Sequence, residues 1–307
     1  MSEIIIGTRK SQLAVAQSTL VAEELAEKFP DYKFSLKKMS TKGDRIIDRS
    51  LIEIGGKGLF IKEIEIALLN QEIDLAVHSL KDMPGEIANE FELIATPQRA
   101  NPLDVLISKD DKILEELPQG AKIGTGSLRR KAQLLNYRPD LEIVPIRGNI
   151  DTRIKKLYSQ DLDAIVLAAA GLERMGWSDK ISQYLEPAIS LPAVGQGVLA
   201  LEVRSNDDSI KELVKGINHH DTYVRVAAER SFLSYLEGSC KIPIAAYAQI
   251  EDDELSIEGM VASLDGSRLL RAKLKGSREE AKELGVKLAQ RLVEQGAAEI
   301  LAEIKEG

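Results

Sequence analysis

Short apolar strands alternate with helices along most of this chain of 307 residues, and that alternation limits the possible folds more than any other feature. The apolar runs and helix-breaking residues predict strands at 4–6, 32–39, 73–77, 104–108, 142–146, 163–167 and 198–203. Helices are expected from Ser11 to Pro30, 59–70, 128–137 and 149–158. Such alternation implies parallel sheets, with the loops at the carboxyl ends of the strands forming a ligand crevice.

Two sections of the chain echo each other. Ile6-Gly7-Thr8 before one helix recurs as Ile123-Gly124-Thr125, and Asp74-Leu75-Ala76-Val77 recurs as Asp163-Ala164-Ile165-Val166. The spacings between the echoes differ, so chance similarity stays open beside duplication. Residues 190–197 are rich in helix breakers and are expected to cross between two domains, after which 198–203 returns to the first sheet.

The pattern changes after Asn218. A helix at 221–236, strands at 244–250, 255–262 and 268–274, and a helix at 277–294 predict a small α+β domain with Cys240 on its first loop. We therefore expect three domains: 1–97 with 198–217, 98–197, and 218–307.

Composition excludes several classes of function. A net charge of −8 disfavours general binding to nucleic acids or anionic membranes. The longest apolar run, 164–170, is too short to span a bilayer, and the three histidines lack the spacing of a metal site. One cysteine and no signal-like start fit the cytoplasm. That cysteine, Cys240, is either a small buried hydrophobe or a reactive loop thiol beside Lys241.

The predicted crevice loops are basic. Residues 121–156 contain nine Lys or Arg against three acidic residues. Arg129 and Arg130 fall in the first turn of a helix, where cations oppose the macrodipole, and Ser127 precedes them. Arg9 and Lys10 precede another helix start in the same way. The alternatives are a solvated basic face and a site for a polyanion; the arginines favour carboxylates as the anion.

One carboxylate stands at the rim of this crevice. Asp82 follows a buried strand and lies next to Lys81. A carboxylate in that position can exchange protons or stabilise a cationic intermediate. A salt bridge to Lys81 or a turn cap explains it equally well.

Further motifs carry a resemblance to a known family. The run Glu229-Arg230-x-Phe232-x-x-x-Leu236-x-Gly238-Ser239-Cys240-x-Ile242-Pro243 is similar to the cofactor-attachment signature of the porphobilinogen deaminases, also called hydroxymethylbilane synthases. The resemblance extends over essentially the whole chain, through Gly7-Thr8-Arg9-x-Ser11, Gly55-Gly56-Lys57-Gly58-Leu59-Phe60, Val77-His78-Ser79-Leu80-Lys81-Asp82, Ser127-Leu128-Arg129-Arg130, Arg147-Gly148-Asn149 and 191–197. Gly126 departs from the family, which usually has serine there; one hydroxyl contact to the ligand would be lost.

The resemblance implies a transferase of tetrapyrrole biosynthesis (EC 2.5.1.61). Such enzymes join four porphobilinogen molecules head to tail, release ammonia each time, and free hydroxymethylbilane, which passes to a downstream cyclising synthase. By similarity, Cys240 holds a dipyrromethane cofactor through a thioether, and Asp82 is the catalytic group that assists ammonia loss. The cofactor would also be bound by Ser79, Lys81, Thr125, Ser127, Arg129, Arg130, Arg147 and Gly148, and the substrate by Arg9, Ser11, Lys57, Arg153, Arg174 and Gln196. No metal is expected.

The fold expected with this function has two similar doubly wound α/β domains of the type II periplasmic-binding-protein kind and a small α+β C-terminal domain. Residues 41–56 would form a lid, and the chain would act as a monomer in the cytoplasm, without nucleic-acid or membrane partners. The main alternative is a two-lobed carboxylate-binding protein without catalysis, which gives no reason for the Gly-Ser-Cys loop. A DNA-binding regulator using 127–138 as a recognition helix fits the acidic total poorly.

Overall fold

The computed structural model describes residues 2–40, 61–85, 87–237 and 242–306. The predicted lid, Lys57 and Cys240 lie outside the described residues. Contacts divide the chain into two compact units, Met1–Ala100 with Val198–Tyr223, and Asn101–Gly197 with Val224–Gly307. No helix in the described ranges is long and apolar enough to cross a membrane.

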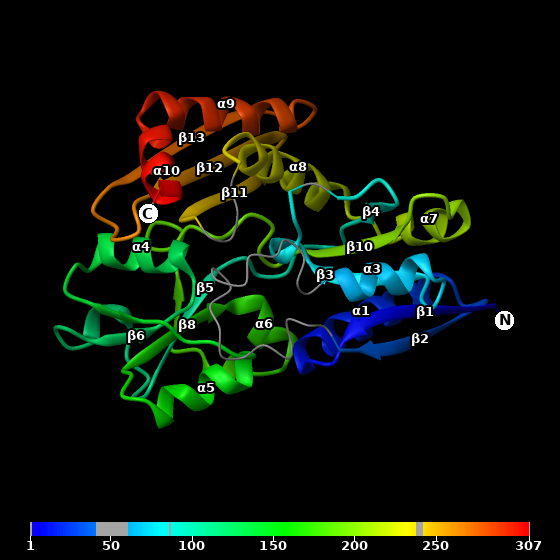
Figure 1. Cartoon of the computed structure of the whole chain (residues 1–307), viewed down its shortest axis with the longest axis horizontal. Helices are drawn as coiled ribbons and strands as arrows, with labels where there is room; N and C mark the ends of the chain where they lie inside the picture. Colours follow the sequence, from blue (N-terminus) through cyan, green and yellow to red (C-terminus); the bar gives the residue numbers. More distant parts are fainter. Residues whose placement is uncertain (1, 41–60, 86, 238–241, 307) are drawn as a thin grey trace. The chain divides into compact units, whose positions relative to one another are not determined.

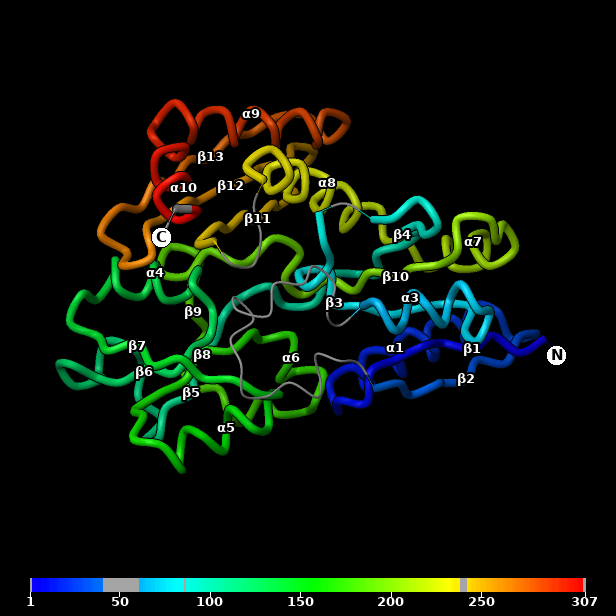
Figure 2. The backbone as a smooth tube through the Cα atoms, viewed as in Figure 1, coloured from blue at the N-terminus to red at the C-terminus, as the bar shows by residue number. Residues whose placement is uncertain are grey.

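The first unit contains a five-stranded sheet with helices on both faces (Figures 1 and 2). In spatial order its strands are β2 (Tyr32–Met39), β1 (Ser2–Arg9), β3 (Leu75–Ser79), β10 (Leu199–Arg204) and β4 (Phe91–Ala95). Helices α1 (Gln12–Lys28) and α7 (Asp208–Lys215) share one apolar core with the sheet, and α3 (Lys62–Leu69) contributes to a second. Ser11 caps α1 by accepting from the Ala14 N–H, as its position predicts.

The second unit begins with a sheet of the same plan. Its strands, in spatial order, are β7 (Glu142–Val144), β6 (Lys122–Gly124), β8 (Ala164–Ala168), β5 (Asp104–Ser108) and β9 (Gln183–Leu185). Helix α4 (Leu128–Tyr137) packs into one apolar core, and α5 (Ile150–Ser159) and α6 (Ala169–Arg174) pack into the other. The predicted bounds of β5 and α4 are confirmed.

The two sheets match in detail at the echoed motifs. The Asp74 carboxylate accepts from the Ile5 N–H at 2.9 Å, and the Asp163 carboxylate accepts from the Lys122 N–H at 2.7 Å. These pairs occupy equivalent places in the two echoes, and each joins one strand to the residue before its neighbouring strand. A similarity that extends from sequence to strand order and to a half-buried side-chain bond favours duplication over chance.

Neither α/β sheet is wholly parallel, so that expectation was wrong. In the first sheet β10 runs antiparallel to β3 and β4, and in the second β5 runs antiparallel to β8 and β9. Each of these strands is the first to follow a passage of the chain from one unit to the other, after Ala100 or Gly197. It therefore enters the sheet without the crossover helix that makes consecutive strands parallel.

The rest of the second unit is an antiparallel sheet, β11 (Ile244–Glu251), β12 (Glu254–Ala262) and β13 (Leu269–Ser277). Helices α8 (His220–Tyr235), α9 (Ala281–Glu294) and α10 (Ala297–Glu306) pack against this sheet. Helix α8 begins in the first unit. Apolar residues of these helices and of the sheet form one core, which includes Phe232, Ile257 and Leu288. A smaller cluster on Ala132 of α4 and Met260 of β12 joins this sheet to the preceding one. The α+β prediction is confirmed. Strands β4, β6 and β9 and helices α6, α7 and α10 were not predicted.

Candidate functional site

In the first unit, the predicted site residues lie at the carboxyl edge of neighbouring strands. Arg9 ends β1, Ser11 caps the helix that follows, and Ser79 ends β3. The chain then turns through a short 3₁₀ helix, Leu80–Asp82, whose first N–H donates to the Val198 carbonyl at 3.0 Å. Asp82 is exposed at the end of this turn. The side chain is thus open to a ligand or solvent, at the end of a turn whose first residue is bonded to Val198, just before β10.

Two buried polar contacts in the first unit support this edge and were missed from the sequence. The Gln17 side chain, on α1, donates to the Ser79 hydroxyl at 3.0 Å. His78 Nε2 lies 2.9 Å from a carboxylate oxygen of Glu202, and both side chains are buried. Gln17 and His78 could have been found only as polar residues on otherwise apolar faces of α1 and β3.

In the second unit, the loop between β6 and α4 is ordered by its own hydroxyl groups. The buried Thr125 hydroxyl accepts from the Ser127 N–H at 3.2 Å. The Ser127 hydroxyl in turn accepts from the Arg130 N–H at 3.4 Å, which caps α4. Between them, a Cβ on Gly126 would lie 2.8 Å from the Ile146 carbonyl oxygen. The departure from the family's serine therefore permits a close approach of two backbone segments, besides removing a hydroxyl.

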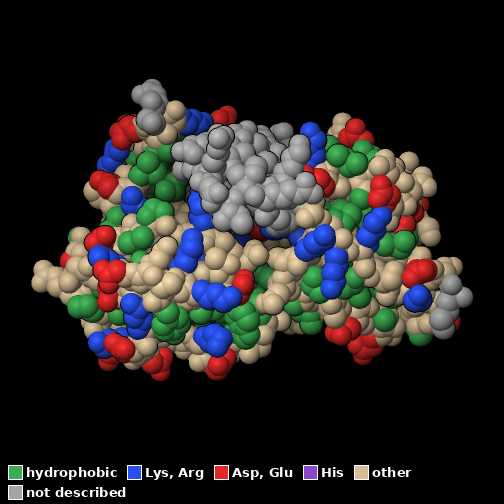
Figure 3. Space-filling model, turned by 60° about the horizontal axis from the view of Figure 1, so that its bottom comes forward, with side chains coloured by type: hydrophobic (Ala, Val, Ile, Leu, Met, Phe, Trp, Pro, Cys, Tyr) green, Lys and Arg blue, Asp and Glu red, His purple; other side chains and the backbone are tan. Residues whose placement is uncertain are grey.

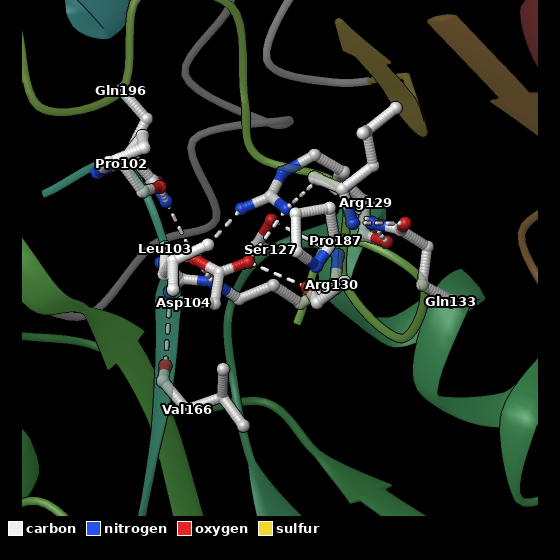
Figure 4. A network of polar contacts seen from close by, with 12 residues as sticks. Pro102, Leu103, Asp104, Ser127, Arg129, Arg130, Gln133, Val166, Pro187 and Gln196 are labelled. Carbon is white, nitrogen blue, oxygen red and sulfur yellow. Dashed lines mark hydrogen bonds and ion pairs between the residues drawn. The ribbon is translucent and has the colours of Figure 1, made fainter. Parts of the chain in front are cut away.

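A buried carboxylate on β5 organises the arginines of α4 (Figure 4). Asp104 is fully buried and accepts from Arg129 at 2.7 and 3.2 Å and from Arg130 at 2.7 and 2.9 Å. Ser190 donates to it at 2.7 Å and Gln196 at 2.9 Å. The guanidiniums also donate to backbone carbonyls, Arg129 to Leu191 at 2.6 Å and Arg130 to Val166 at 3.0 Å. We call Asp104, Arg129 and Arg130 the buried charge cluster.

The electrostatics of the buried charge cluster follow from its charges. Burial opposes ionisation of Asp104, but the two guanidiniums outweigh it and hold its pKa well below the usual range. Burial lowers the pKa of Arg130; Asp104 opposes this change and the like charge of Arg129 adds to it. The first-turn cations are thus offset by an internal anion, which the sequence prediction of an external anion did not include. The sequence of its strand does not mark Asp104 as the counter-ion of these arginines, because Asp104 is simply the first residue before an apolar run.

The other predicted residues of the second unit surround the carboxyl edge of β6, β7 and β8. Gly148 has φ of 112°, a left-handed conformation that favours glycine, and its carbonyl accepts from Arg153 at 2.8 Å. Arg147 is half-buried beside it. Arg174, at the end of α6, donates to the Gly197 carbonyl at 2.8 Å, and burial lowers its pKa to about 10. A guanidinium in such surroundings favours a nearby anion.

The crossover between the units is held by a second buried carboxylate. Glu229, on α8, is fully buried and accepts from the Gly195 N–H at 2.7 Å and from the Ala248 N–H at 2.9 Å. It therefore ties the crossover, which carries Gln196, to the first strand of the C-terminal sheet. Helix α8 ends at Tyr235, and Glu237, two residues later, has a left-handed φ of 50°.

Basic side chains on the surface are in contact with solvent, unlike the arginines of the buried charge cluster. On the face drawn in Figure 3, Lys and Arg side chains are interspersed with acidic and apolar ones. Several exposed cations have nearby carboxylates, as Lys33 has in Glu3 at 3.1 Å and Lys215 in Glu212 at 2.7 Å. Exposed pairs contribute little to binding or stability, so the argument for an anion site depends on the buried arginines.

Two α/β sheets of one plan, and a third, antiparallel sheet packed against the second of them, define the class of multi-domain α/β proteins. Family models give the more specific class: "Porphobilinogen deaminase, dipyromethane cofactor binding domain" matches residues 4–212, and "Porphobilinogen deaminase, C-terminal domain" matches 223–294. The chain belongs to the porphobilinogen deaminase family.

Curated relatives of similar sequence belong to the same family. The porphobilinogen deaminase of Alkaliphilus metalliredigens is 50% identical over 301 residues, covering 98% of this chain and 95% of that protein. That of Halalkalibacterium halodurans is 50% identical over 309 residues, covering 100% and 99%. The predicted family, its transferase activity in tetrapyrrole biosynthesis and its dipyrromethane cofactor are thereby confirmed.

Solved structures with a similar chain path are more distant. The probable amino-acid ABC transporter extracellular-binding protein ytmK from Bacillus subtilis has a TM-score of 0.43 and 15% identity, covering 71% of this chain and 90% of that one. CbnR, a LysR family transcriptional regulator, has a TM-score of 0.44 and 11% identity, covering 71% and 70%.

Proposed function

We propose that Asp82 is the catalytic group of this porphobilinogen deaminase, that Arg129 and Arg130 receive ligand carboxylates, and that Cys240 carries the dipyrromethane cofactor through a thioether. The observation that supports this most is the buried charge cluster, in which two guanidiniums share one carboxylate. The cofactor and porphobilinogen both bear acetate and propionate groups. A buried cluster with excess positive charge at the carboxyl edge of a sheet fits such a ligand.

The remaining assignments follow the same chemistry. We assign the carboxylates of the cofactor to Ser79, Lys81, Thr125, Ser127, Arg147 and Gly148, and those of the substrate to Arg9, Ser11, Lys57, Arg153, Arg174 and Gln196. Among these residues Lys57 lies outside the part of the chain that the structure describes. When bound, the cofactor supplies the pyrrole end to which the first substrate is joined. The exposed Asp82 carboxylate would take and return protons at the substrate amino group and at the pyrrole carbon that forms the new bond.

Intact-protein mass spectrometry tests the attachment. We expect an adduct of dipyrromethane mass on the purified chain and no adduct on Cys240→Ala. Wild-type protein that is active but unmodified would contradict the thioether.

A second pair of variants tests the catalytic assignment. Asp82→Ala should keep its fold and its adduct and lose nearly all turnover, a drop of about 100-fold or more, because the group that moves protons is gone. Asp31→Ala, an exposed residue of the same unit, is the control and should turn over normally. Normal turnover in Asp82→Ala would remove this residue from the mechanism.

We also propose that the protein is a cytoplasmic monomer that delivers hydroxymethylbilane to a cyclising synthase, and that its domains are 1–97 with 198–217, 98–197 and 218–307. Size-exclusion chromatography with light scattering over a range of concentrations tests the oligomeric state; a mass that doubles with concentration would contradict it.

A further inference from the structure

The buried charge cluster contains an unequal number of charges. Two guanidiniums face one carboxylate, so its formal charge is +1 while Asp104 is ionised. The charged side chains that shift the pKa of Arg130, in the part of the chain that the structure describes, are Asp104 and Arg129. Side-chain exposures of 6% for each arginine and 0% for Asp104 keep water from screening this charge.

The guanidiniums are also fixed in orientation. Six hydrogen bonds join them to Asp104 and to the carbonyls of Leu191 and Val166. Because two arginines together have ten N–H donors, these bonds leave donors that a ligand can use. Asp104 provides four of the six bonds, so it determines where those remaining donors point.

We infer that Asp104 is a positioning residue for ligand carboxylates. It orients Arg129 and Arg130 before the ligand arrives, and it leaves one buried positive charge for one carboxylate of the ligand to neutralise. With a neutral residue at 104, the two guanidiniums would repel each other and lose their common acceptor. This inference rests on the proposed role of the two arginines and adds the residue on which that role depends.

Chemical rescue separates positioning from simple loss of stability. Asp104→Ala removes the carboxylate and leaves room for formate, whereas Asp104→Asn keeps the volume and leaves none. Asp140→Ala removes an exposed partner of Arg138, beyond the other end of α4, and is the matched control. Ser190→Ala removes one donor to Asp104 and gives a milder variant that should fold in any case.

Two readouts are taken on each full-length variant after circular dichroism has shown that it is folded. The first is the fraction of molecules that carry the dipyrromethane adduct. The second is the melting temperature in sodium formate compared with sodium chloride at the same ionic strength. The melting temperature requires no cofactor, so it tests Asp104 even if the proposed thioether is wrong.

The expected pattern is specific. Adduct occupancy in Asp104→Ala and Asp104→Asn should fall to about a tenth of the wild-type value or less, and in Ser190→Ala it should fall partly. Formate, but not chloride, should raise the melting temperature of Asp104→Ala, and should restore adduct formation when that protein is incubated with porphobilinogen. Asp104→Asn, Asp140→Ala and the wild type should not respond to formate.

Two results would overturn the inference. One is full adduct occupancy and an unchanged substrate KM in folded Asp104→Ala or Asp104→Asn. The other is an equal response to formate in all variants, since a general salt effect requires no site. If the wild type lacks the adduct, or Cys240→Ala keeps it, the proposed attachment fails instead, and the formate comparison still decides the role of Asp104.

Discussion

Glu229→Gln should destabilise the second unit by an amount that can be worked from its contacts. The Glu229 carboxylate accepts from two backbone N–H groups, at 2.7 and 2.9 Å, with no exposed surface. A glutamine can accept from only one of them, and its amide NH₂ then faces the other. The change removes one charge-assisted bond of about 1.5–3 kcal/mol and leaves a buried donor unpaired at about 1–3 kcal/mol.

The expected loss is therefore about 2.5–6 kcal/mol. For a unit of 150–250 residues, this corresponds to a melting temperature lowered by roughly 5–24 °C. Thermal unfolding followed by circular dichroism measures it, and Glu283→Gln, an exposed glutamate on α9, should change stability by less than about 0.5 kcal/mol.

Hydrogen exchange identifies where the effect lies. The Gly195 and Ala248 amides should lose protection first in Glu229→Gln, since they are the donors that Glu229 pairs. A shift below 2 °C, or unchanged protection of both amides, would refute the reasoning that this carboxylate holds the crossover to the C-terminal sheet.

Three further predictions concern close contacts and burial. Gly285→Ala should cost about 2–3 kcal/mol in urea unfolding, because its Cβ would lie 2.1 Å from the Ala228 carbonyl oxygen; a cost below 1 kcal/mol would contradict that packing. Gly126→Ser and Gly126→Ala should raise the substrate KM equally, because the Cβ meets the Ile146 carbonyl in both. A lower KM in Gly126→Ser alone would show that the serine hydroxyl affects binding more than this close contact does. Burial raises the pKa of Glu65 in the folded protein, so its ionised form destabilises the protein above that pKa and has no effect below the unfolded pKa of about 4.3. Glu65→Gln should therefore stabilise the protein at pH 7. The difference in urea midpoint between this variant and the wild type should vanish as the pH falls toward 4.

The sequence predicted the helices that begin after a capping residue. Ser11 and Ser127 are N-cap residues, and both helices begin one residue later, as the pattern of serine before a helical stripe requires. Residues 208–215 and 297–306 also form helices, and neither helix was predicted from the sequence. Strands β4 and β9 are short and at sheet edges, where apolar alternation is weak and pairing depends on a distant strand.

The candidate site shows the same division between local and long-range information. The arginines of α4 were predicted to meet an anion because cations oppose the helix dipole there. The anion in the structure, Asp104, is 25 and 26 residues away in sequence and comes from a strand whose next three residues are apolar. A count of charges over a local window therefore cannot give the charge of the site, because its counter-ion lies outside the window.

The charge that we propose binds a ligand depends on burial rather than on the number of basic residues. Among the nine basic residues at 121–156, only Arg129 and Arg130 are buried. The others are half-buried or exposed and are in contact with solvent, where salt screens a charge within about 8 Å. The buried charge cluster, by contrast, has its +1 in surroundings of low dielectric, where the same charge acts several times more strongly on a carboxylate. A chain of net charge −8 can thus bind a polycarboxylate, because repulsion from exposed acids is screened while attraction to two buried arginines is not. It follows that raising the salt concentration should weaken substrate binding much less than removing Asp104 does.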